Sequence, residues 1–210
     1  MLWAACLLAF FGFLRCSEFT ISTQHSHETT KHLSSGDISV DSHEKPTVMA
    51  VRIKASKTDQ FGKGVTLYLG RGQAALCPVT AILQYLAIRP QSTGPMFIFQ
   101  DNRPLTKESF ISHVHQALAA EGIDTQYYKG HSFRIGAATT AAACGLSESL
   151  IKTLGRWSSS AYQLYIRTPP SEPSMVTSKL SSLTDPWLLT LLILVFGFVW
   201  FDVHVWSSLL

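Results

Sequence analysis

The sequence predicts an α+β domain, because both helical and extended patterns occur along the chain. In residues 77–90 the apolar side chains recur at helical spacing, with Pro78 near the expected start and Pro90 just past the expected end. In residues 51–54 apolar and basic residues alternate instead, as in a strand with one wet face. The 210 residues suffice for one well-cored domain of about 150–180 residues plus a tail.

Composition and charge are compatible with a nucleic-acid partner without requiring one. The chain has 17 basic and 14 acidic residues, a formal net charge of +3. Residues 186–210 hold one acid and no base, so residues 1–185 carry a net charge of +4. Such a weakly basic domain fits a polyanion. The cysteines form no Cys-x-x-Cys pair, which favours a reducing compartment over a disulfide framework: they are Cys6, Cys16, Cys77 and Cys144.

The chain opens with an apolar run over residues 2–14 that is followed by Arg15. Unlike a secretory signal, the run has no basic leader before it and no evident small-residue cleavage site after it. We therefore expect a buried helix with Arg15 at its polar end; a secretory or anchor signal is the alternative. Arg15 could merely end this helix and pair with Glu18, but the apolar run would then have no reason to point the arginine inward.

Residues 21–46 are polar and give a strand signal only at residues 37–41. Their four histidines could suggest a metal site, but no cysteine and no second cluster at ligand spacing accompany them. We interpret the stretch as a solvated loop and expect no metal; the histidines are His25, His27, His32 and His43. His113 and His115, further along, face different directions on a predicted helix, so they are not expected to share a metal either.

Two extended segments, residues 47–54 and 65–72, flank a turn that contains Gly62 and Gly64. This pattern predicts a β-hairpin. We interpret the basic residues of this hairpin as a DNA contact; a charged edge that prevents strand pairing, which is common, is the alternative. Against the single acid Asp59, the hairpin carries five basic residues: Arg52, Lys54, Lys57, Lys63 and Arg71.

Local signals predict three more helices in the second half of the chain. Thr106 starts the sequence Thr-Lys-Glu-Ser, which has the chemistry of a helix N-cap. Ser147 is a candidate cap for a helix over residues 146–154. An Ala- and Thr-rich helical pattern begins close to His131.

Residues 130–167 contain most of the candidate catalytic side chains. His131 and Arg134 are three apart, so on a helix they share a face and can address one anion. Gly-Arg-Trp follows at residues 155–157, and then Tyr165. An arginine fork, an imidazole and an indole N–H all donate hydrogen bonds to phosphate oxygens, and a nearby tyrosine is a candidate nucleophile on phosphorus. Each piece alone has a plain explanation as a surface pair or as core packing; the order and combination are specific.

Together these motifs resemble the catalytic core of the tyrosine recombinase (phage integrase) family, and more narrowly the recombinases of Crypton and DIRS/Ngaro mobile elements. The sequence Gly-Phe-Leu-Arg-Cys-Ser-Glu at residues 12–18 also resembles the first arginine box of the family. The resemblance covers residues 2–183. It implies a mostly helical catalytic domain with a small three-stranded antiparallel sheet, double-stranded DNA as the partner, a nuclear location, a synaptic tetramer, and no cofactor.

The resemblance also implies roles for individual residues. A tyrosine, Tyr165, attacks the scissile phosphate to give a 3'-phosphotyrosyl bond and a free 5'-hydroxyl. A lysine on the hairpin, Lys57 with Lys54 as runner-up, protonates the leaving oxygen. Four residues hold the phosphoryl oxygens: Arg15, His131, Arg134 and Trp157. Five further basic residues are expected to contact DNA: Arg52, Lys54, Lys63, Arg71 and Arg156.

Two tyrosines compete for the role of nucleophile. Tyr162 and Tyr165 are three apart, so helical periodicity allows both to face the phosphate. The resemblance favours Tyr165, because Ile166 and Arg167 follow it directly as they can in the family. Its spacing from Trp157 is slightly shorter than the family pattern, so Tyr162 stays open as the alternative.

We divide the chain into a catalytic domain, residues 1–183, and a hydrophobic tail, residues 184–210. Residues 187–201 are uncharged and would rise about 22 Å as a helix, short of the ~30 Å hydrocarbon core. Extension to residue 206 reaches spanning length, which makes 187–206 a candidate membrane partner and a membrane location the alternative to the nucleus. An extension acquired at the end of a broken gene copy explains the tail equally well. Residues 171–183 are candidates for docking on a neighbouring protomer.

The family's N-terminal core-binding domain has no counterpart in this sequence. Since phosphate contacts dominate affinity, we expect weak and strongly salt-dependent DNA binding. A catalytically inactive DNA-binding remnant of a mobile element therefore stays an alternative to an active enzyme. A membrane-tethered protein of unknown role is the third hypothesis.

Overall fold

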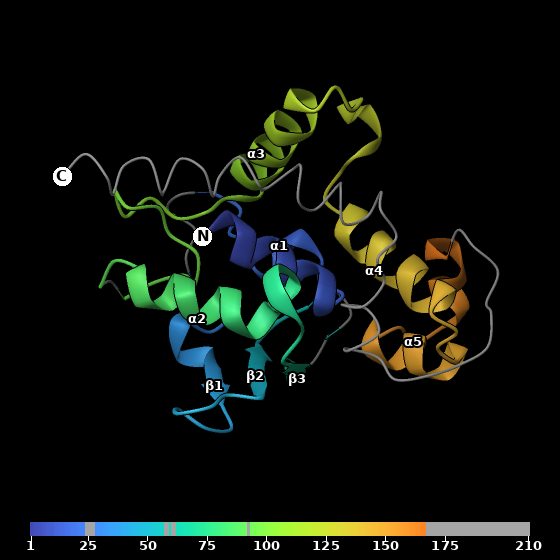
Figure 1. The fold of residues 1–210 in the computed structure, drawn as a ribbon, viewed down its shortest axis with the longest axis horizontal. Coiled ribbons are helices and arrows are strands. Elements are labelled where there is room, and N and C mark those ends of the chain that lie inside the picture. The colour runs from blue at the N-terminus through green and yellow to red at the C-terminus, as the bar shows by residue number, and fades with distance from the viewer. Residues whose placement is uncertain (24–27, 57–58, 60–61, 92, 167–210) are drawn as a thin grey trace.

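The computed structural model describes residues 1–23, 28–56, 59, 62–91 and 93–166. In this part of the chain, helices and strands are combined in one α+β domain, as predicted (Figure 1). The elements in chain order are α1 (Leu2–Phe11), β1 (Ile38–Val40), β2 (Val48–Ile53), β3 (Val65–Gly70), α2 (Pro78–Ile88), α3 (Lys107–Ala120), α4 (Ser132–Ala143) and α5 (Glu148–Leu154), with short 3₁₀ turns between them.

Helix α1 lies at the centre of the domain, where it packs against α2 and α4 (Figure 1). Every residue from Ala4 to Phe10 is buried. A helix that is apolar all round has no face to offer to water and therefore lies inside a core. The predicted buried helix is confirmed. Among the described residues, no helix combines the length and the apolarity that a membrane crossing needs.

The end of α1 differs from the prediction. The helix stops at Phe11, and Gly12 is its C-cap. Phe13 then adopts a positive φ of 51°, which turns the chain away from the helix axis. Arg15 therefore lies beyond the helix, in an extended conformation that begins a 3₁₀ turn over Cys16–Glu18. The expectation that Arg15 stands on the helix itself was wrong.

The three strands form one antiparallel sheet in the order β1–β2–β3, as the resemblance implied. Val51 of β2 pairs with Ile38 on one side and with Leu67 on the other. Along β2 the side chains alternate, because Met49, Val51 and Ile53 are buried while Arg52 is exposed. The buried side chains join those of α1 and α2 in the main hydrophobic core.

A second hydrophobic cluster forms where α4 meets the end of α1. Alanines of α4, including Ala137 and Ala141, have no exposed surface and share this cluster with Phe10 and Phe13. Trp157 completes it from the far end of the described chain. The small alanine side chains let α4 lie close to α1, so residues from the two ends of the domain meet here.

The predicted helix caps are confirmed. The backbone N–H of Ser109 donates to the Thr106 hydroxyl at 3.1 Å, and that of Leu150 donates to the Ser147 hydroxyl at 3.3 Å. The predictions made for residues 171–183 and for the tail at 184–210 concern residues outside the described part of the chain.

Candidate active site

Arg15 is held by a carboxylate that is almost completely buried. Its guanidinium Nη1 lies 3.2 Å from Oε1 of Glu18, whose side chain is 1% exposed. The Arg15 backbone N–H donates to Oε2 of the same carboxylate at 2.7 Å. Arg15 thus binds Glu18 through one guanidinium nitrogen, and the rest of its five N–H donors are not used by this pair.

Arg156 reaches the same carboxylate from the other end of the domain. Its Nη2 lies 3.0 Å from Glu18 Oε2. Its Nη1 donates to the Gly12 carbonyl at 2.9 Å and to the Leu154 carbonyl at 3.3 Å, and Nη2 also donates to the Phe13 carbonyl at 3.3 Å. One buried carboxylate therefore joins two arginines that are far apart in the sequence.

Arg134 lies near these two arginines and has no exposed surface. Its Nη1 donates to the Phe13 carbonyl and its Nη2 to the Gly155 carbonyl. Burial lowers the pKa of Arg134 to about 10, and the positive charges of Arg15 and Arg156 add to this effect. The three arginines outnumber the single carboxylate of Glu18, so the site holds excess positive charge in a poorly solvated place. Such a site attracts an anion.

Trp157 covers the guanidinium of Arg134. The Cζ atom of Arg134 lies 4.1 Å from the centre of the indole ring, which is a cation–π contact. The ring also meets Phe13 edge-on at 6.5 Å between centroids. Trp157 is 8% exposed, so in this arrangement its indole is mainly a packing surface for Arg134.

The Trp157 ring lies so close to Gly155 that the glycine cannot carry a side chain. A Cβ built on Gly155 would stand 1.6 Å from a ring carbon of Trp157. We expect Gly155→Ala to displace the indole and to lower the free energy of unfolding by about 1–3 kcal/mol or more, as overpacking does. Urea denaturation measures this change.

The matched control is Gly36→Ala, because a Cβ there would meet only the Ser34 hydroxyl, at 3.9 Å. We expect that change to stay within about 0.5 kcal/mol. Equal stability of both variants would show that the indole does not need the place it has in the structure.

Tyr165 lies against the Arg134–Trp157 pair. Its ring centroid is 5.2 Å from that of Trp157, and the Arg134 Cζ lies 5.9 Å from the Tyr165 ring. The Thr139 hydroxyl of α4 donates to the Tyr165 carbonyl at 3.0 Å and fixes the backbone. Within the described residues the Tyr165 hydroxyl makes no hydrogen bond, so it is available for a ligand.

Tyr162 belongs to the same 3₁₀ helix, Ser160–Tyr165, but has a different environment. It is 5% exposed, and its hydroxyl donates to the carboxylate of Glu148 on α5. This hydrogen bond raises the pKa of Tyr162, with a smaller contribution from burial, because it stabilises the neutral phenol. Tyr162 has a proton acceptor and Tyr165 has a cation beside it. Helical periodicity did not distinguish the two tyrosines, whereas the structure gives their hydroxyls different environments.

His131 precedes α4 as its N-cap residue, and its side chain is exposed. Arg134, one turn later, is fully buried. The predicted helix start is confirmed. The two side chains nevertheless differ in depth, since only His131 is open to solvent while Arg134 lies under Trp157. The roles of both residues toward phosphate stay predictions.

The predicted hairpin is present, but Lys57 lies outside the described residues. The runner-up, Lys54, has its ammonium 2.7 Å from Asp37 Oδ2 and also donates to the carbonyls of Thr29 and His32. A role for Lys54 in proton transfer would require these contacts to break. The remaining predicted DNA contacts on the hairpin, Arg52, Lys63 and Arg71, are exposed.

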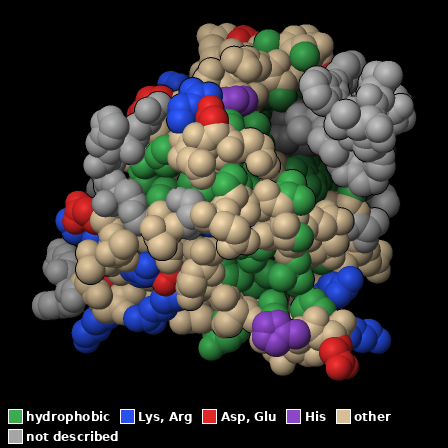
Figure 2. All heavy atoms as spheres, turned by 90° about the vertical axis from the view of Figure 1, so that its left-hand side faces the viewer, with side chains coloured by type: hydrophobic (Ala, Val, Ile, Leu, Met, Phe, Trp, Pro, Cys, Tyr) green, Lys and Arg blue, Asp and Glu red, His purple; other side chains and the backbone are tan. Residues whose placement is uncertain are grey.

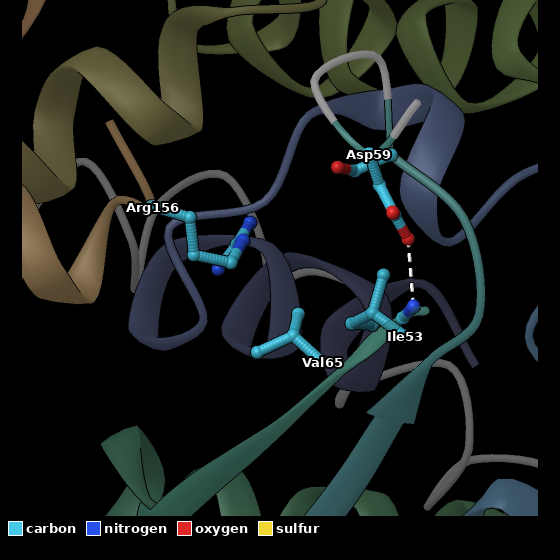
Figure 3. A pocket seen from close by; sticks show the side chains of 6 residues that line it. Ile53, Asp59, Val65 and Arg156 are labelled. Atoms are coloured by element: carbon cyan, nitrogen blue, oxygen red, sulfur yellow. Dashed lines mark hydrogen bonds between the residues drawn. The ribbon is translucent and has the colours of Figure 1, made fainter. Parts of the chain in front are cut away.

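A pocket lies between the hairpin and Arg156. Figure 3 shows Arg156 and Asp59 on opposite sides of it, with Ile53 and Val65 between them. Its volume is roughly 260 Å³. Asp59 accepts the Gly64 backbone N–H at 2.6 Å, which fixes the end of the turn. The pocket is lined by Ile53, Ser56, Asp59, Gly64, Val65 and Arg156.

Figure 2 shows the face of the molecule that lies at the left of Figure 1. Apolar side chains occupy much of its centre and basic side chains stand at its margins (Figure 2). Within the described ranges, no three side chains of the kinds that bind metals come together.

Two contacts at this site were not predicted from the sequence. The bond from Tyr162 to Glu148 joins residues of two elements, and nothing in the local pattern of α5 marks Glu148 as a partner. Arg156 was expected to face DNA, yet its side chain is 12% exposed and bound to Glu18. Only the unusual sequence Gly-Arg-Trp, with a charged residue between a cap glycine and a buried indole, could have indicated an inward-facing arginine.

No protein-family model matches the sequence, and no curated protein matches it significantly. The structure, by contrast, is similar to solved DNA-bound recombinases. XerH site-specific recombinase bound to its difH substrate matches with a TM-score of 0.56 at 16% identity, over 79% of this chain and 42% of that chain. The Tn1549 transposon integrase in complex with circular intermediate DNA matches with a TM-score of 0.51 at 12% identity, over 79% of this chain and 53% of that chain.

The chain thus spans about half the length of these proteins. At such low identities the likeness establishes a shared fold. The predicted fold is confirmed: the described domain has the α+β fold of the matched regions of XerH and the Tn1549 integrase.

Proposed function

We propose that this chain supplies the catalytic domain of a tyrosine recombinase, which cuts and rejoins double-stranded DNA through a 3'-phosphotyrosyl intermediate. One observation carries the proposal. The Tyr165 ring lies against the buried Arg134, and near it two further arginines, Arg15 and Arg156, share the carboxylate of Glu18. A phenol beside concentrated positive charge is suited to attack a phosphodiester, because the charge holds the phosphate and stabilises the negative charge that develops on it.

In the proposed reaction the Tyr165 hydroxyl gives its proton to solvent water as its oxygen attacks phosphorus in line. The bond from phosphorus to Tyr165 forms as the bond to the 5'-oxygen breaks, and Lys57 gives its proton to that oxygen. The phosphoester energy stays in the protein–DNA bond, so the reverse attack by a 5'-hydroxyl can rejoin a strand without a nucleotide cofactor. Arg15, Arg134, His131 and Trp157 stabilise the charge on the phosphoryl oxygens, as the resemblance implies.

Arg134 can take part in two ways. Both of its terminal nitrogens donate to carbonyls, so its charge acts on the phosphate at a short distance without a direct bond. A bidentate contact through its fork would require DNA binding to exchange one carbonyl for a phosphate oxygen. Arg15, with donors to spare, is the better direct ligand in the arrangement described here.

The wider context of the proposal follows from the sequence motifs. The Gly-Arg-Trp and Tyr-Ile-Arg sequences support a mobile-element recombinase of the Crypton and DIRS/Ngaro kind. Such a protein would act in the nucleus and would assemble as a tetramer on two DNA duplexes. XerH and the Tn1549 integrase are both described as bound to DNA, which supports DNA as the partner.

Trapping of the covalent intermediate tests the proposal. The full chain is incubated with a pool of DNA duplexes that carry a nick in randomised sequence, so that the short cleaved strand diffuses away and religation fails. We expect a protein–DNA adduct that survives denaturing electrophoresis and disappears after protease treatment. DNA binding without any adduct would instead support the inactive DNA-binding remnant.

Lys57 has a separate chemical signature. We expect Lys57→Ala to slow cleavage of an ordinary phosphodiester by roughly 100-fold or more, as loss of a general acid does. A substrate with sulfur at the bridging 5'-position should restore most of the rate, because a thiolate leaves without a proton. Lys54→Ala is the matched control, since its ammonium is bound to Asp37. Rescue by sulfur in Lys54→Ala and not in Lys57→Ala would reverse the assignment.

A further inference from the structure

We propose that Arg156 acts from inside the protein as a positioning residue: it occupies half of the Glu18 carboxylate and thereby leaves the guanidinium fork of Arg15 open for phosphate. This inference rests on the proposed function. It replaces the expectation that Arg156 contacts DNA directly.

The two terminal nitrogens of Arg156 are already engaged within the protein, while its buried Nε has no hydrogen-bond partner among the described residues. Both terminal nitrogens donate to carbonyls of the Gly12–Phe13 turn, and Nη2 also contacts Glu18. The side chain is 12% exposed, the same as that of Arg15, so the hydrogen bonds and not the exposure distinguish the two arginines. Burial lowers the pKa of Arg156, and its neighbour Glu18 opposes this effect. A phosphate would have to displace these partners one by one.

The backbone supports the same role. Arg156 has a positive φ of 58°, a conformation that residues with a side chain rarely adopt. Its backbone N–H donates to the Thr153 carbonyl at 3.0 Å. This turn directs the side chain back toward α1 and the turn that follows it. The chain therefore accepts an unfavourable backbone angle at the residue that brings a positive charge to Glu18.

The sharing of Glu18 explains how Arg156 affects Arg15. Arg15 contacts only Oε1 with its side chain, while Oε2 accepts from Arg156 and from the Arg15 backbone. An arginine alone with a carboxylate tends to form a bidentate pair, in which two of its nitrogens are used. Arg156 competes for the second oxygen and neutralises the carboxylate. Without Arg156, Glu18 would draw the Arg15 fork into such a pair.

This mechanism predicts that a second substitution repairs the first. Arg156→Gln should slow adduct formation on saturating nicked DNA by roughly 10- to 100-fold, the range caused by small displacements of a catalytic group. It should also lower the salt slope of DNA binding by about one, because one phosphate contact, that of Arg15, is lost. Adding Glu18→Gln removes the carboxylate that captures Arg15. The double variant should regain at least tenfold in rate and the original salt slope.

A direct DNA contact by Arg156 predicts the opposite outcome, since Glu18→Gln cannot replace a lost phosphate ligand. The matched control is Arg71→Gln on the exposed hairpin. This change should also lower the salt slope of DNA binding, and adding Glu18→Gln should not restore it. Arg156→Lys keeps a charge beside Glu18 and should retain most of the rate; it also serves if Arg156→Gln fails to fold. Absence of repair in the double variant overturns the inference.

The two hypotheses fail in different ways. If the unmodified chain forms no adduct, the proposed function fails, but the salt slopes of the single and double variants still decide the role of Arg156. If the unmodified chain forms an adduct and the double variant is no better than Arg156→Gln, only the positioning role is wrong.

Discussion

Arg134→Ala is expected to cost about 3–5 kcal/mol of folding free energy, the range for removing one partner of a buried charged network. The side chain has no exposed surface, and its loss would leave the buried carbonyls of Phe13 and Gly155 without these donors. It would also remove the support of the Trp157 ring. Cleavage of DNA should fall by at least ~1000-fold, because the same change removes charge from the phosphate site. Thermal and urea denaturation measure the first effect, and adduct trapping the second.

Arg103→Ala is the matched control for Arg134→Ala. Arg103 is an exposed arginine that pairs with an exposed carboxylate, that of Asp101, at 2.6 Å. Exposed pairs contribute little, so we expect a change within about 1 kcal/mol and unchanged cleavage. Arg134→Lys should also cleave poorly, since a single ammonium lacks the planar fork whose two nitrogens bind the two carbonyls of Phe13 and Gly155. Wild-type cleavage by Arg134→Ala would remove the phosphoryl-transfer interpretation altogether.

Tyr165→Phe is expected to abolish the covalent adduct completely while DNA binding and stability remain close to those of the unmodified chain. The hydroxyl makes no hydrogen bond within the described residues, so its removal leaves no partner unsatisfied. The ring keeps its place against Trp157 and Arg134, because these contacts involve carbon atoms of the ring. The change therefore isolates the chemistry of one oxygen atom. Adduct trapping and a binding assay at the same salt concentration measure both outcomes.

Tyr162→Phe is the matched control, because it removes the same atom three residues earlier. Here the lost hydroxyl leaves Glu148 without its donor, so we expect some loss of stability but a persistent adduct. An adduct that survives in Tyr165→Phe and disappears in Tyr162→Phe would assign the attack to Tyr162, with Glu148 as its proton acceptor.

Much of the fold could be predicted because its signals are local. The uniformly apolar first helix, the alternation along β2 and the caps at Thr106 and Ser147 each depend on residues that are close in the sequence. The antiparallel sheet and the fold came from the resemblance and were confirmed. The end of α1 was misplaced because the positive φ of Phe13, a residue that rarely adopts it, has no sequence signature.

The arrangement of the candidate site could be predicted only in part. The motifs identified Arg15, Arg134, Trp157 and Tyr165 as a set. The structure brings Arg134, Trp157 and Tyr165 into contact, and it places Arg15 close enough to lower the pKa of Arg134. The burial of each side chain could not be predicted from the sequence, because it depends on contacts between distant segments. An arginine on an Ala-rich helix gives no sign that two carbonyls and an indole will enclose it.

Contacts between distant segments also decide where the hairpin lysine Lys54 points. Its basic residues were read as one DNA-facing group, but Lys54 turns to Asp37 and Ser34 in the preceding segment. The position of Lys54 directly after β2 is compatible with either use. Only the packing of the polar loop against the strand decides between them.

The most direct test of the central claim is to identify the residue that becomes linked to DNA. The adduct of the unmodified chain with nicked DNA is digested with nuclease and protease, and the peptide that retains a nucleotide is sequenced by mass spectrometry. The account predicts a nucleotide phosphate on Tyr165, in the peptide that contains Ser160–Tyr165. A nucleotide on any other residue, or no modified peptide from a chain that binds DNA, would contradict it.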